Sequence, residues 1–138
     1  MGLILDTCLL IDHERGKFDL TAFLSSHGEE LVAISSITFS ELLHGLHRAR
    51  NTEIKAERSR FISSIREDYT IIPFGESQAE QHARIWAELE RAGLMTGAHD
   101  LLIAATALSV GYSLVTFNKS DFDRIPGLIV IEPLPRIR

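Results

Sequence analysis

Four acidic residues of this chain lie where short apolar runs meet expected helices, and carboxylates in such positions can bind metal ions. Asp6 ends the first apolar run, and Glu41 falls in the first turn of the helix expected after the second. Asp100 opens a strongly apolar helix, and Asp121 follows a later apolar run. Because the carboxyl ends of parallel strands lie at one edge of a sheet, we expect these acids to share a crevice there.

Carboxylates that converge on one crevice repel one another unless a cation holds them together. Hard oxygen ligands favour Mg²⁺ or Mn²⁺, ions that keep bound waters and bridge phosphate oxygens. Phosphodiester hydrolysis needs a more acidic water and neutralised phosphoryl oxygens, and a metal held in this way supplies both. Asp6 and Asp100 are the expected direct ligands, whereas Glu41 and Asp121 are expected to reach the metal partly through water.

Each acid also has a simpler interpretation when it is taken alone. Glu41 lies three residues after Thr38 and matches a capping box, and the helix dipole favours an acid at Asp100. Applied to all four acids, this interpretation is strained, because Asp6 ends a buried strand and no cap supplies it with a partner. A shared metal site is therefore the favoured hypothesis.

Short apolar runs alternate with helical segments along the chain, a pattern typical of α/β proteins with a parallel sheet. Strands are expected over residues 3–5, 31–34, 70–74, 113–116 and 128–131. Helices are expected over residues 7–11 and 22–26, from about residue 38, and over 51–68, 76–92, 99–110 and 121–124. We therefore predict a three-layer α/β/α fold, with a central parallel sheet of about five strands and a helical hairpin after the second strand.

The composition fits one soluble domain that covers residues 1–138. Hydrophobic residues make up 45% and charged residues 24% of the chain, which is ordinary for a globular protein with one core. The single cysteine, Cys8, excludes an internal disulfide. Because no apolar run approaches the roughly 20 residues of a membrane span and no secretory signal is visible, we expect a cytoplasmic protein.

Charge is distributed unevenly along the chain, whose net charge is −5. Residues 48–66 contain six basic and two acidic side chains, a local charge of +4 that leaves −9 for the rest. A basic helical arm beside an acidic pocket can hold a phosphate backbone, and the candidate RNA-binding residues are Arg48, Arg50 and Lys55. The alternative is a solvated helix face stabilised by i,i+4 ion pairs.

Four blocks of sequence occur in an order that is typical of one known family. They are LDT at residues 5–7, ITFSELLHG at 37–45, DLLIAA at 100–105 and VTFNKSDF at 115–122. With the strand and helix pattern, they resemble the PIN-domain family, and within it the VapC-type toxins of bacterial toxin–antitoxin pairs. The resemblance implies a metal-dependent endoribonuclease that uses Mg²⁺ or Mn²⁺. Its catalytic acids here would be Asp6, Glu41, Asp100 and Asp121.

Three polar residues are expected to support these acids. Thr7 and Thr116 offer hydroxyls that can orient the carboxylates. The resemblance adds Asn118, which with Thr116 belongs to the polar residues of the fourth block.

The resemblance also implies what the protein binds. It implies an RNA substrate and a cognate VapB-like antitoxin that wraps the protein and blocks the acidic pocket, with no membrane involved. It implies a homodimer as well, for which the amphipathic helices around Phe61 and Trp86 would offer an apolar patch. One alternative stays open: a PIN-like binding module that works mainly in complex with a DNA-binding antitoxin, with little nuclease turnover.

Overall fold

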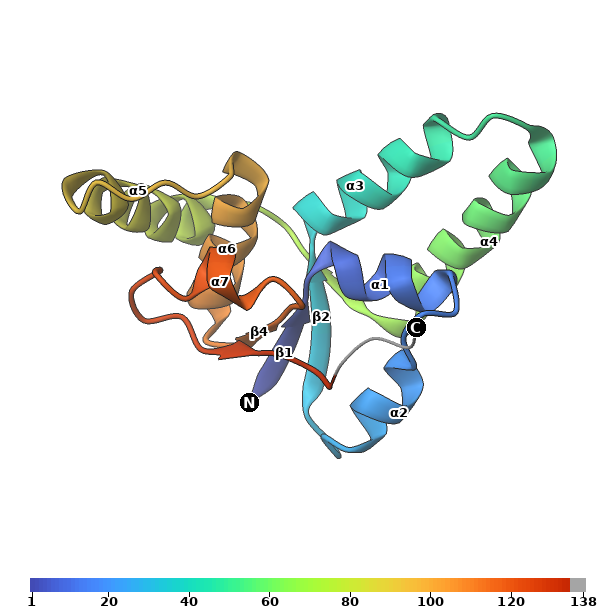
Figure 1. Ribbon diagram of the computed structural model, residues 1–138, viewed down its shortest axis with the longest axis horizontal. Helices are drawn as coiled ribbons and strands as arrows, with labels where there is room; N and C mark the ends of the chain where they lie inside the picture. The colour runs from blue at the N-terminus through green and yellow to red at the C-terminus, as the bar shows by residue number, and fades with distance from the viewer. Residues whose placement is uncertain (135–138) are drawn as a thin grey trace.

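The structure, a computed structural model, describes residues 1–134 and is built on one parallel sheet of five strands (Figure 1). The strands are β1 (Gly2–Leu5), β2 (Leu31–Ser35), β3 (Thr70–Ile72), β4 (Ser113–Val115) and β5 (Val130–Ile131). They lie in the order β3-β2-β1-β4-β5, and every neighbouring pair is parallel. The predicted parallel sheet is thus confirmed. The last four residues of the expected 1–138 domain lie outside the described part.

Helices connect the strands, so that each crossover returns the chain to the same end of the sheet. The helices within residues 1–134 are α1 (Thr7–Glu14), α2 (Leu20–Ser25), α3 (Ser36–His47), α4 (Thr52–Asp68), α5 (Glu76–Arg91), α6 (Ala98–Val110) and α7 (Lys119–Phe122). None of these helices is both long enough and apolar enough to span a membrane.

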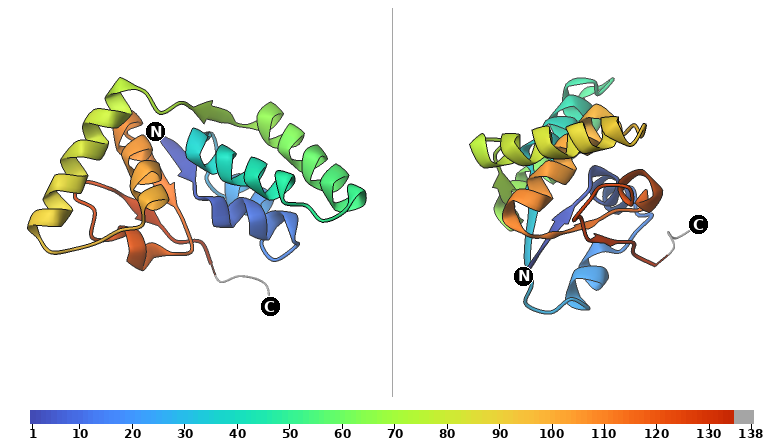
Figure 2. Two further views of the ribbon diagram at one scale, coloured as in Figure 1. Left: turned by 90° about the horizontal axis from the view of Figure 1, so that it is seen from above. Right: turned by 90° about the vertical axis from the view of Figure 1, so that its left-hand side faces the viewer.

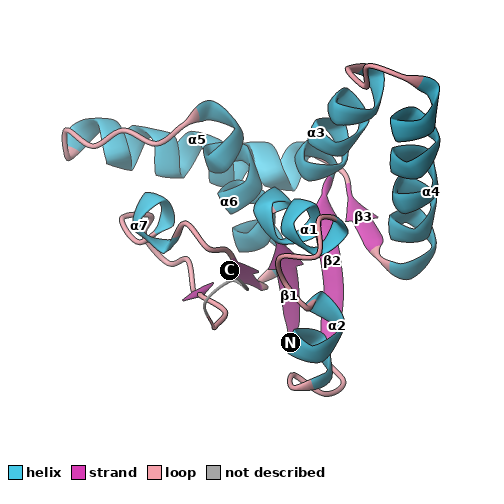
Figure 3. Cartoon of the chain, turned by 45° about the vertical axis from the view of Figure 1, so that its right-hand side comes forward, coloured by secondary structure: helices cyan, strands magenta, loops and turns pink. Residues whose placement is uncertain are grey.

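Alternate residues of the strands supply two separate cores, one on each face of the sheet. Ile4 of β1 and Leu114 of β4 pack with residues of α5 and α6. Leu3 and Leu5 of β1 pack instead with residues of α1, α2 and α4. Figure 3 shows α1 and α2 lying over β1 and β2. Helices therefore cover both faces of the sheet, which confirms the predicted three-layer fold.

Helix α6 is apolar along most of its length because it packs between the sheet and α5 (Figure 2). Ile103, Ala104 and Ala107 are at most 1% exposed. Gly111 ends the helix at φ 70°, a left-handed conformation that glycine adopts without strain. This packing fixes the first turn of α6, which carries Asp100.

The predicted helical hairpin after the second strand is confirmed, and it projects away from the sheet (Figure 1). Its second helix, α4, begins after Asn51, whose side chain accepts a hydrogen bond from the Ile54 backbone N–H at 2.8 Å. Arg58 Nη1 donates to the Gly45 carbonyl at 2.6 Å and so ties α4 to α3. The hairpin is therefore held by a polar contact as well as by apolar packing.

The start of α3 differs from the sequence prediction. Ser35, not Thr38, is the N-cap, because the Ser35 Oγ accepts a hydrogen bond from the Thr38 backbone N–H at 3.0 Å. Ser35 is the last residue of β2, so its hydroxyl is the first that can reach the free N–H groups of the helix. The capping box between Thr38 and Glu41 is therefore wrong, and Glu41 lies in the second turn of α3.

Candidate active site

Asp6 lies at the junction of β1 and α1 and is 5% exposed. Its backbone N–H continues the sheet by donating to the Val115 carbonyl at 2.9 Å. Its side chain is the N-cap of α1, with Oδ1 accepting from the Thr7 backbone N–H at 2.8 Å. Oδ2 accepts from Thr116 Oγ1 at 2.7 Å and from the Cys8 thiol at 3.5 Å. The prediction that no cap serves Asp6 is wrong, because Asp6 is itself the cap.

Burial and hydrogen bonding act in opposite directions on Asp6. Burial raises the pKa of the Asp6 carboxyl above its usual value, and the hydrogen bonds from Thr116, Thr7 and Cys8 only partly offset this. The Cys8 thiol is itself half-buried, and burial together with the Asp6 charge raises its pKa to about 11. Cys8 is therefore a neutral thiol that donates to Asp6, not a reactive thiolate.

Thr116 connects Asp6 to the segment that follows β4. Its side chain is fully buried, and its Oγ1 donates to Asp6 while accepting from the Asn118 backbone N–H at 3.0 Å. Both residues were predicted to support the acids from the sequence. The structure gives Asn118 a backbone contact with the Thr116 hydroxyl, and the role of both residues in supporting the acids stays a prediction.

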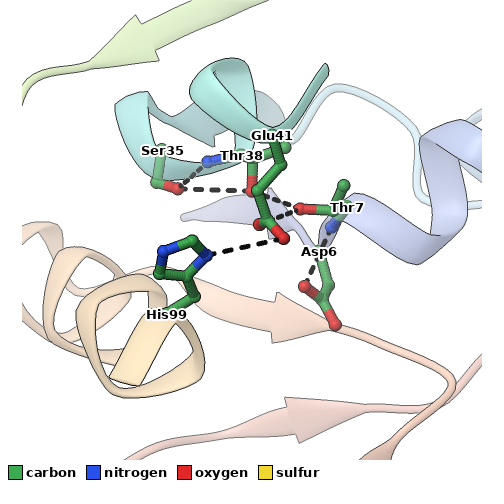
Figure 4. A network of polar contacts seen from close by, with 6 residues as sticks. All are labelled: Asp6, Thr7, Ser35, Thr38, Glu41 and His99. Atoms are coloured by element: carbon green, nitrogen blue, oxygen red, sulfur yellow. Dashed lines mark hydrogen bonds and ion pairs between the residues drawn. The ribbon is translucent and has the colours of Figure 1, made fainter. Parts of the chain in front are cut away.

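Glu41 reaches the same region from α3 (Figure 4). Its Oε1 accepts from Thr7 Oγ1 at 2.8 Å, and its Oε2 lies 3.7 Å from Nδ1 of His99. Thr7 thus uses its backbone N–H on Asp6 and its hydroxyl on Glu41. The two carboxylates are held by successive donors of one residue, which fixes their relative positions.

A further pair of hydroxyls lies behind Thr7 (Figure 4). Thr7 Oγ1 lies 3.1 Å from Thr38 Oγ1, which lies 3.3 Å from Ser35 Oγ. Ser35 and Thr38 are fully buried. This network was not predicted from the sequence, because Thr7 and Thr38 are 31 positions apart.

Asp100 is half-buried in the first turn of α6 and has the most perturbed carboxyl of the four acids. Its pKa is raised to about 6, mainly by burial and then by the charges of Asp6, Asp121 and Glu41 in that order, while His99 lowers it. A carboxylate feels such charges only when they are near. The four predicted acids therefore lie together at one end of the sheet.

Asp121 differs from the other three acids in its exposure. It lies in α7 on the surface, and its backbone N–H donates to the Asn118 carbonyl at 3.0 Å. Its charge is one of those that raise the pKa of Asp100, so the two carboxyl groups are near each other. Asp121 is thus positioned at the rim of the site, where a water-mediated contact is easier than a direct one.

The donor set fits a hard divalent cation. Among the described residues, His99 alone forms an ion pair with any of the four acids, so much of their negative charge is unbalanced. Within residues 1–134, no three His, Cys, Asp or Glu side chains are close enough to form a metal cage by themselves. Mg²⁺ is usually held by one or two carboxylates together with waters and substrate phosphates, so an open set of oxygens suits it.

A groove of about 510 Å³ opens from the site along α1, α3 and α4. Thr7, Glu41 and His99 line one part of it, and Arg48 lines another. The rest of the lining includes the apolar side chains Ile11, Phe61 and Ile62 and the basic side chains Arg15 and Arg58. The groove therefore joins Glu41 to Arg48 at the basic end of the hairpin.

The basic segment at residues 48–66 is divided between two uses. Arg58 is bonded to Gly45, and the guanidinium of Arg66 lies 4.9 Å from the centre of the Phe39 ring. Arg48, Arg50 and Lys55 are exposed around the turn between α3 and α4. The structure thus leaves the three predicted RNA-binding side chains accessible, whereas Arg58 and Arg66 stabilise the hairpin.

Phe61 and Trp86 do not form the single apolar patch that was expected. Phe61 lines the groove beside α4. Trp86, 53% exposed, lines a separate apolar groove of about 730 Å³ with Leu94 and Met95. The prediction is wrong because α4 and α5 cover opposite faces of the sheet (Figure 1).

Comparison with known proteins identifies the family. The family model described as "PIN domain" matches residues 3–128. The chain belongs to the PIN-domain family. This PIN domain is 43% identical over 131 residues to "Ribonuclease VapC1" of Rickettsia felis, which covers 95% of this chain and 96% of the relative. It is 33% identical over 118 residues to "tRNA(fMet)-specific endonuclease VapC" of Salmonella typhimurium, covering 85% of this chain and 81% of the relative.

Solved structures agree with this assignment. The PIN domain matches a chain of DNA-bound VapBC from Salmonella typhimurium with a TM-score of 0.86 at 26% identity, over 96% of this chain and 98% of the other. It matches a chain of VapBC2 from Rickettsia felis, bound to a promoter DNA fragment, with a TM-score of 0.85 at 27% identity. That match covers 96% of this chain and 99% of the other.

Proposed function

We propose that this PIN domain is a metal-dependent endoribonuclease and the toxin of a bacterial toxin–antitoxin pair. The observation that supports the proposal most is the position of Asp6, Glu41 and Asp121 near the Asp100 carboxyl, whose pKa their charges raise. Relatives named as VapC ribonucleases over nearly the whole chain support the RNA substrate. Acting on RNA, the protein would work in the cytoplasm as one domain.

Asp6 and Asp100 would hold Mg²⁺ or Mn²⁺ directly, and Glu41 and Asp121 would do so partly through water. When bound, the ion acidifies a water molecule and neutralises charge on the phosphoryl oxygens of the scissile bond. Burial of Asp6 and Asp100 suits this role, because a carboxylate that is poorly solvated and surrounded by other acids gains most from a cation.

The residues around these acids would position them for the reaction. Thr116 holds Oδ2 of Asp6 at 2.7 Å, and Thr7 holds Oε1 of Glu41 at 2.8 Å. The second Glu41 oxygen, Oε2, faces His99 on the open side of the site. We assign to Glu41 the orientation of the attacking water, since a carboxylate fixed at one oxygen can accept a hydrogen bond at the other.

RNA would approach along the basic end of the hairpin. Arg48, Arg50 and Lys55 are exposed there, and Arg48 lines the groove that reaches Glu41. Contacts of Lys and Arg with phosphates supply affinity without base specificity. The target is therefore open among transfer, ribosomal and messenger RNA, and the name of the Salmonella relative makes transfer RNA the first substrate to test.

The proposed partner is a VapB-like antitoxin, because several similar solved structures are toxin–antitoxin complexes. An acidic pocket attracts an arginine by the same field that attracts a metal ion. The groove of about 510 Å³ offers apolar contacts beside that pocket for the rest of such a partner. We also propose a homodimer.

The function is tested by inducing the protein in bacteria, with and without its antitoxin, and sequencing new RNA 5′ ends. We expect new ends and growth arrest with the wild type, and neither with Asp6→Asn or Asp100→Asn. Asp68→Asn, an exposed change at the end of α4, serves as the matched control and should behave as wild type. Absence of new ends with the wild type would overturn the proposal and favour a binding module.

A further inference from the structure

Three hydroxyl groups form a continuous chain that ends on Glu41 (Figure 4). Ser35 Oγ lies 3.3 Å from Thr38 Oγ1, and Thr38 Oγ1 lies 3.1 Å from Thr7 Oγ1. Thr7 Oγ1 in turn donates to Glu41 Oε1 at 2.8 Å. Ser35, Thr38 and Thr7 are at most 7% exposed, so water does not compete for these contacts. The chain crosses from the start of α3 to the start of α1 and back to α3.

The Thr7 hydroxyl has one proton and two acceptors within reach, Glu41 Oε1 at 2.8 Å and Thr38 Oγ1 at 3.1 Å. The carboxylate is the closer and the charged acceptor, so the Thr7 proton is assigned to Glu41. Thr38 Oγ1 accepts from Ser35 Oγ at 3.3 Å and holds its place beside the Thr7 hydroxyl. The Ser35 end is consistent, because Ser35 Oγ accepts from the Thr38 backbone N–H at 3.0 Å and keeps its own proton for Thr38.

Capping of α3 does not explain the Thr38 hydroxyl. The cap needs Ser35 Oγ and the Thr38 backbone N–H, and neither involves Thr38 Oγ1. A threonine inside a helix usually donates to the carbonyl four residues earlier, as Thr106 Oγ1 does to Leu102 at 2.9 Å. The contacts of Thr38 Oγ1 are instead with the side chains of Thr7 and Ser35. Its hydroxyl therefore serves the network.

We propose that Ser35 and Thr38 are positioning residues that act through Thr7 to hold Glu41 in one orientation. This inference rests on the proposed nuclease function for its consequence, since an oriented Glu41 matters only if Glu41 takes part in the reaction. Thr38 contacts the Thr7 hydroxyl at 3.1 Å, and the Thr7 hydroxyl holds one oxygen of Glu41 at 2.8 Å. The other oxygen of Glu41 faces Nδ1 of the exposed His99 at 3.7 Å.

The test is a double-mutant cycle with Thr7→Val and Thr38→Val, read by two measurements. The first is the affinity of the RNA-free protein for Mn²⁺, measured by calorimetry, and the second is kcat for RNA cleavage. Outer residues that orient metal ligands typically change affinity or activity by about 10–100-fold. We expect Thr38→Val to lower both by about tenfold, and to add nothing in the Thr7→Val background, because its effect passes through Thr7.

Two controls separate positioning from general stability. Thr106→Val removes another fully buried hydroxyl, far along α6, and should change neither Mn²⁺ affinity nor kcat. Thr38→Ser keeps the hydroxyl and should restore both. Wild-type values for Thr38→Val, or effects of the two valine changes that multiply, would overturn the inference. A wild-type protein that cleaves no RNA would overturn the proposed function instead. The double-mutant cycle read by Mn²⁺ affinity would still test whether Thr38 acts on Glu41 through Thr7.

Discussion

At the scale of single residues, Asp6 joins the fold to the proposed chemistry. It continues the β1–β4 hydrogen bonding with its backbone, caps α1 with Oδ1 and receives the Thr116 hydroxyl on Oδ2. A residue with so many fixed contacts has little freedom to move when a ligand binds. Asp6 is therefore preorganised, and the energy for its burial is supplied when the protein folds.

The raised pKa of Asp100 predicts how the metal-free protein responds to pH. Its pKa rises from 3.8 to about 6 on folding, mainly through burial. Between these values the folded chain binds more protons than the unfolded chain, so the free energy of unfolding falls as pH increases through this window. The raised pKa of Asp6 acts in the same direction. In Asp100→Asn the free energy of unfolding should decrease less steeply with pH, because the substitution removes one of the two carboxyl groups with a raised pKa.

Urea unfolding in the presence of EDTA, across the interval from about pH 4 to 7, measures this effect. Asp68→Asn is the control for removal of an acid that lies outside the site. If the free energy of unfolding changed with pH equally in the wild type and in Asp100→Asn, the raised pKa of Asp100 would be contradicted.

At the scale of elements, the hairpin of α3 and α4 separates arginines that stabilise the fold from those available to RNA. Arg58→Met should lower the free energy of unfolding by roughly 1.5–3 kcal/mol, because it removes the charged group that donates to the Gly45 carbonyl at 2.6 Å. Arg50→Met should leave stability unchanged, because Arg50 is exposed. Arg50→Met should instead weaken RNA binding, and the slope of log affinity against log salt concentration should fall by about one, as expected for one lost phosphate contact.

Both halves of this prediction can be measured on the same pair of proteins. Urea unfolding gives the stability, and fluorescence anisotropy at several salt concentrations gives the RNA affinity. The anisotropy is best done in the Asp100→Asn background, where the RNA should stay intact. If Arg50→Met bound RNA with an unchanged salt dependence, the basic hairpin end would not be the RNA contact.

The sequence was sufficient to predict elements but not their junctions. Apolar periodicity located all five strands and the hairpin, because buried strands and amphipathic helices leave clear patterns. The N-cap of α3 stayed open in the sequence because Ser35, Ser36 and Thr38 offer similar hydroxyls, and only the turn after β2 decides which one is used. The contact of Thr7 with Thr38 joins residues 31 positions apart, so no local pattern predicts it.

At the scale of the whole molecule, charge and apolar surface are arranged around a single end of the sheet. The four acids lie near one another there, and a groove lined by Glu41 runs to Arg48 of the basic hairpin. The apolar groove beside Trp86 belongs to the opposite face, with α5 and α6. An antitoxin bound in the groove beside Glu41 would therefore leave the groove beside Trp86 uncovered. The predicted homodimer could then use the surface around Trp86.

The most direct test of the central claim, that the four acids serve metal-dependent RNA hydrolysis, is cleavage of bacterial RNA by the purified protein in Mg²⁺ or in EDTA. We predict cleavage by the wild type in Mg²⁺, none in EDTA, and a loss of at least about 100-fold in Asp100→Asn, since residues that act as a unit are each essential. Cleavage that persists in EDTA, or in a folded Asp100→Asn protein at the wild-type rate, would contradict the claim.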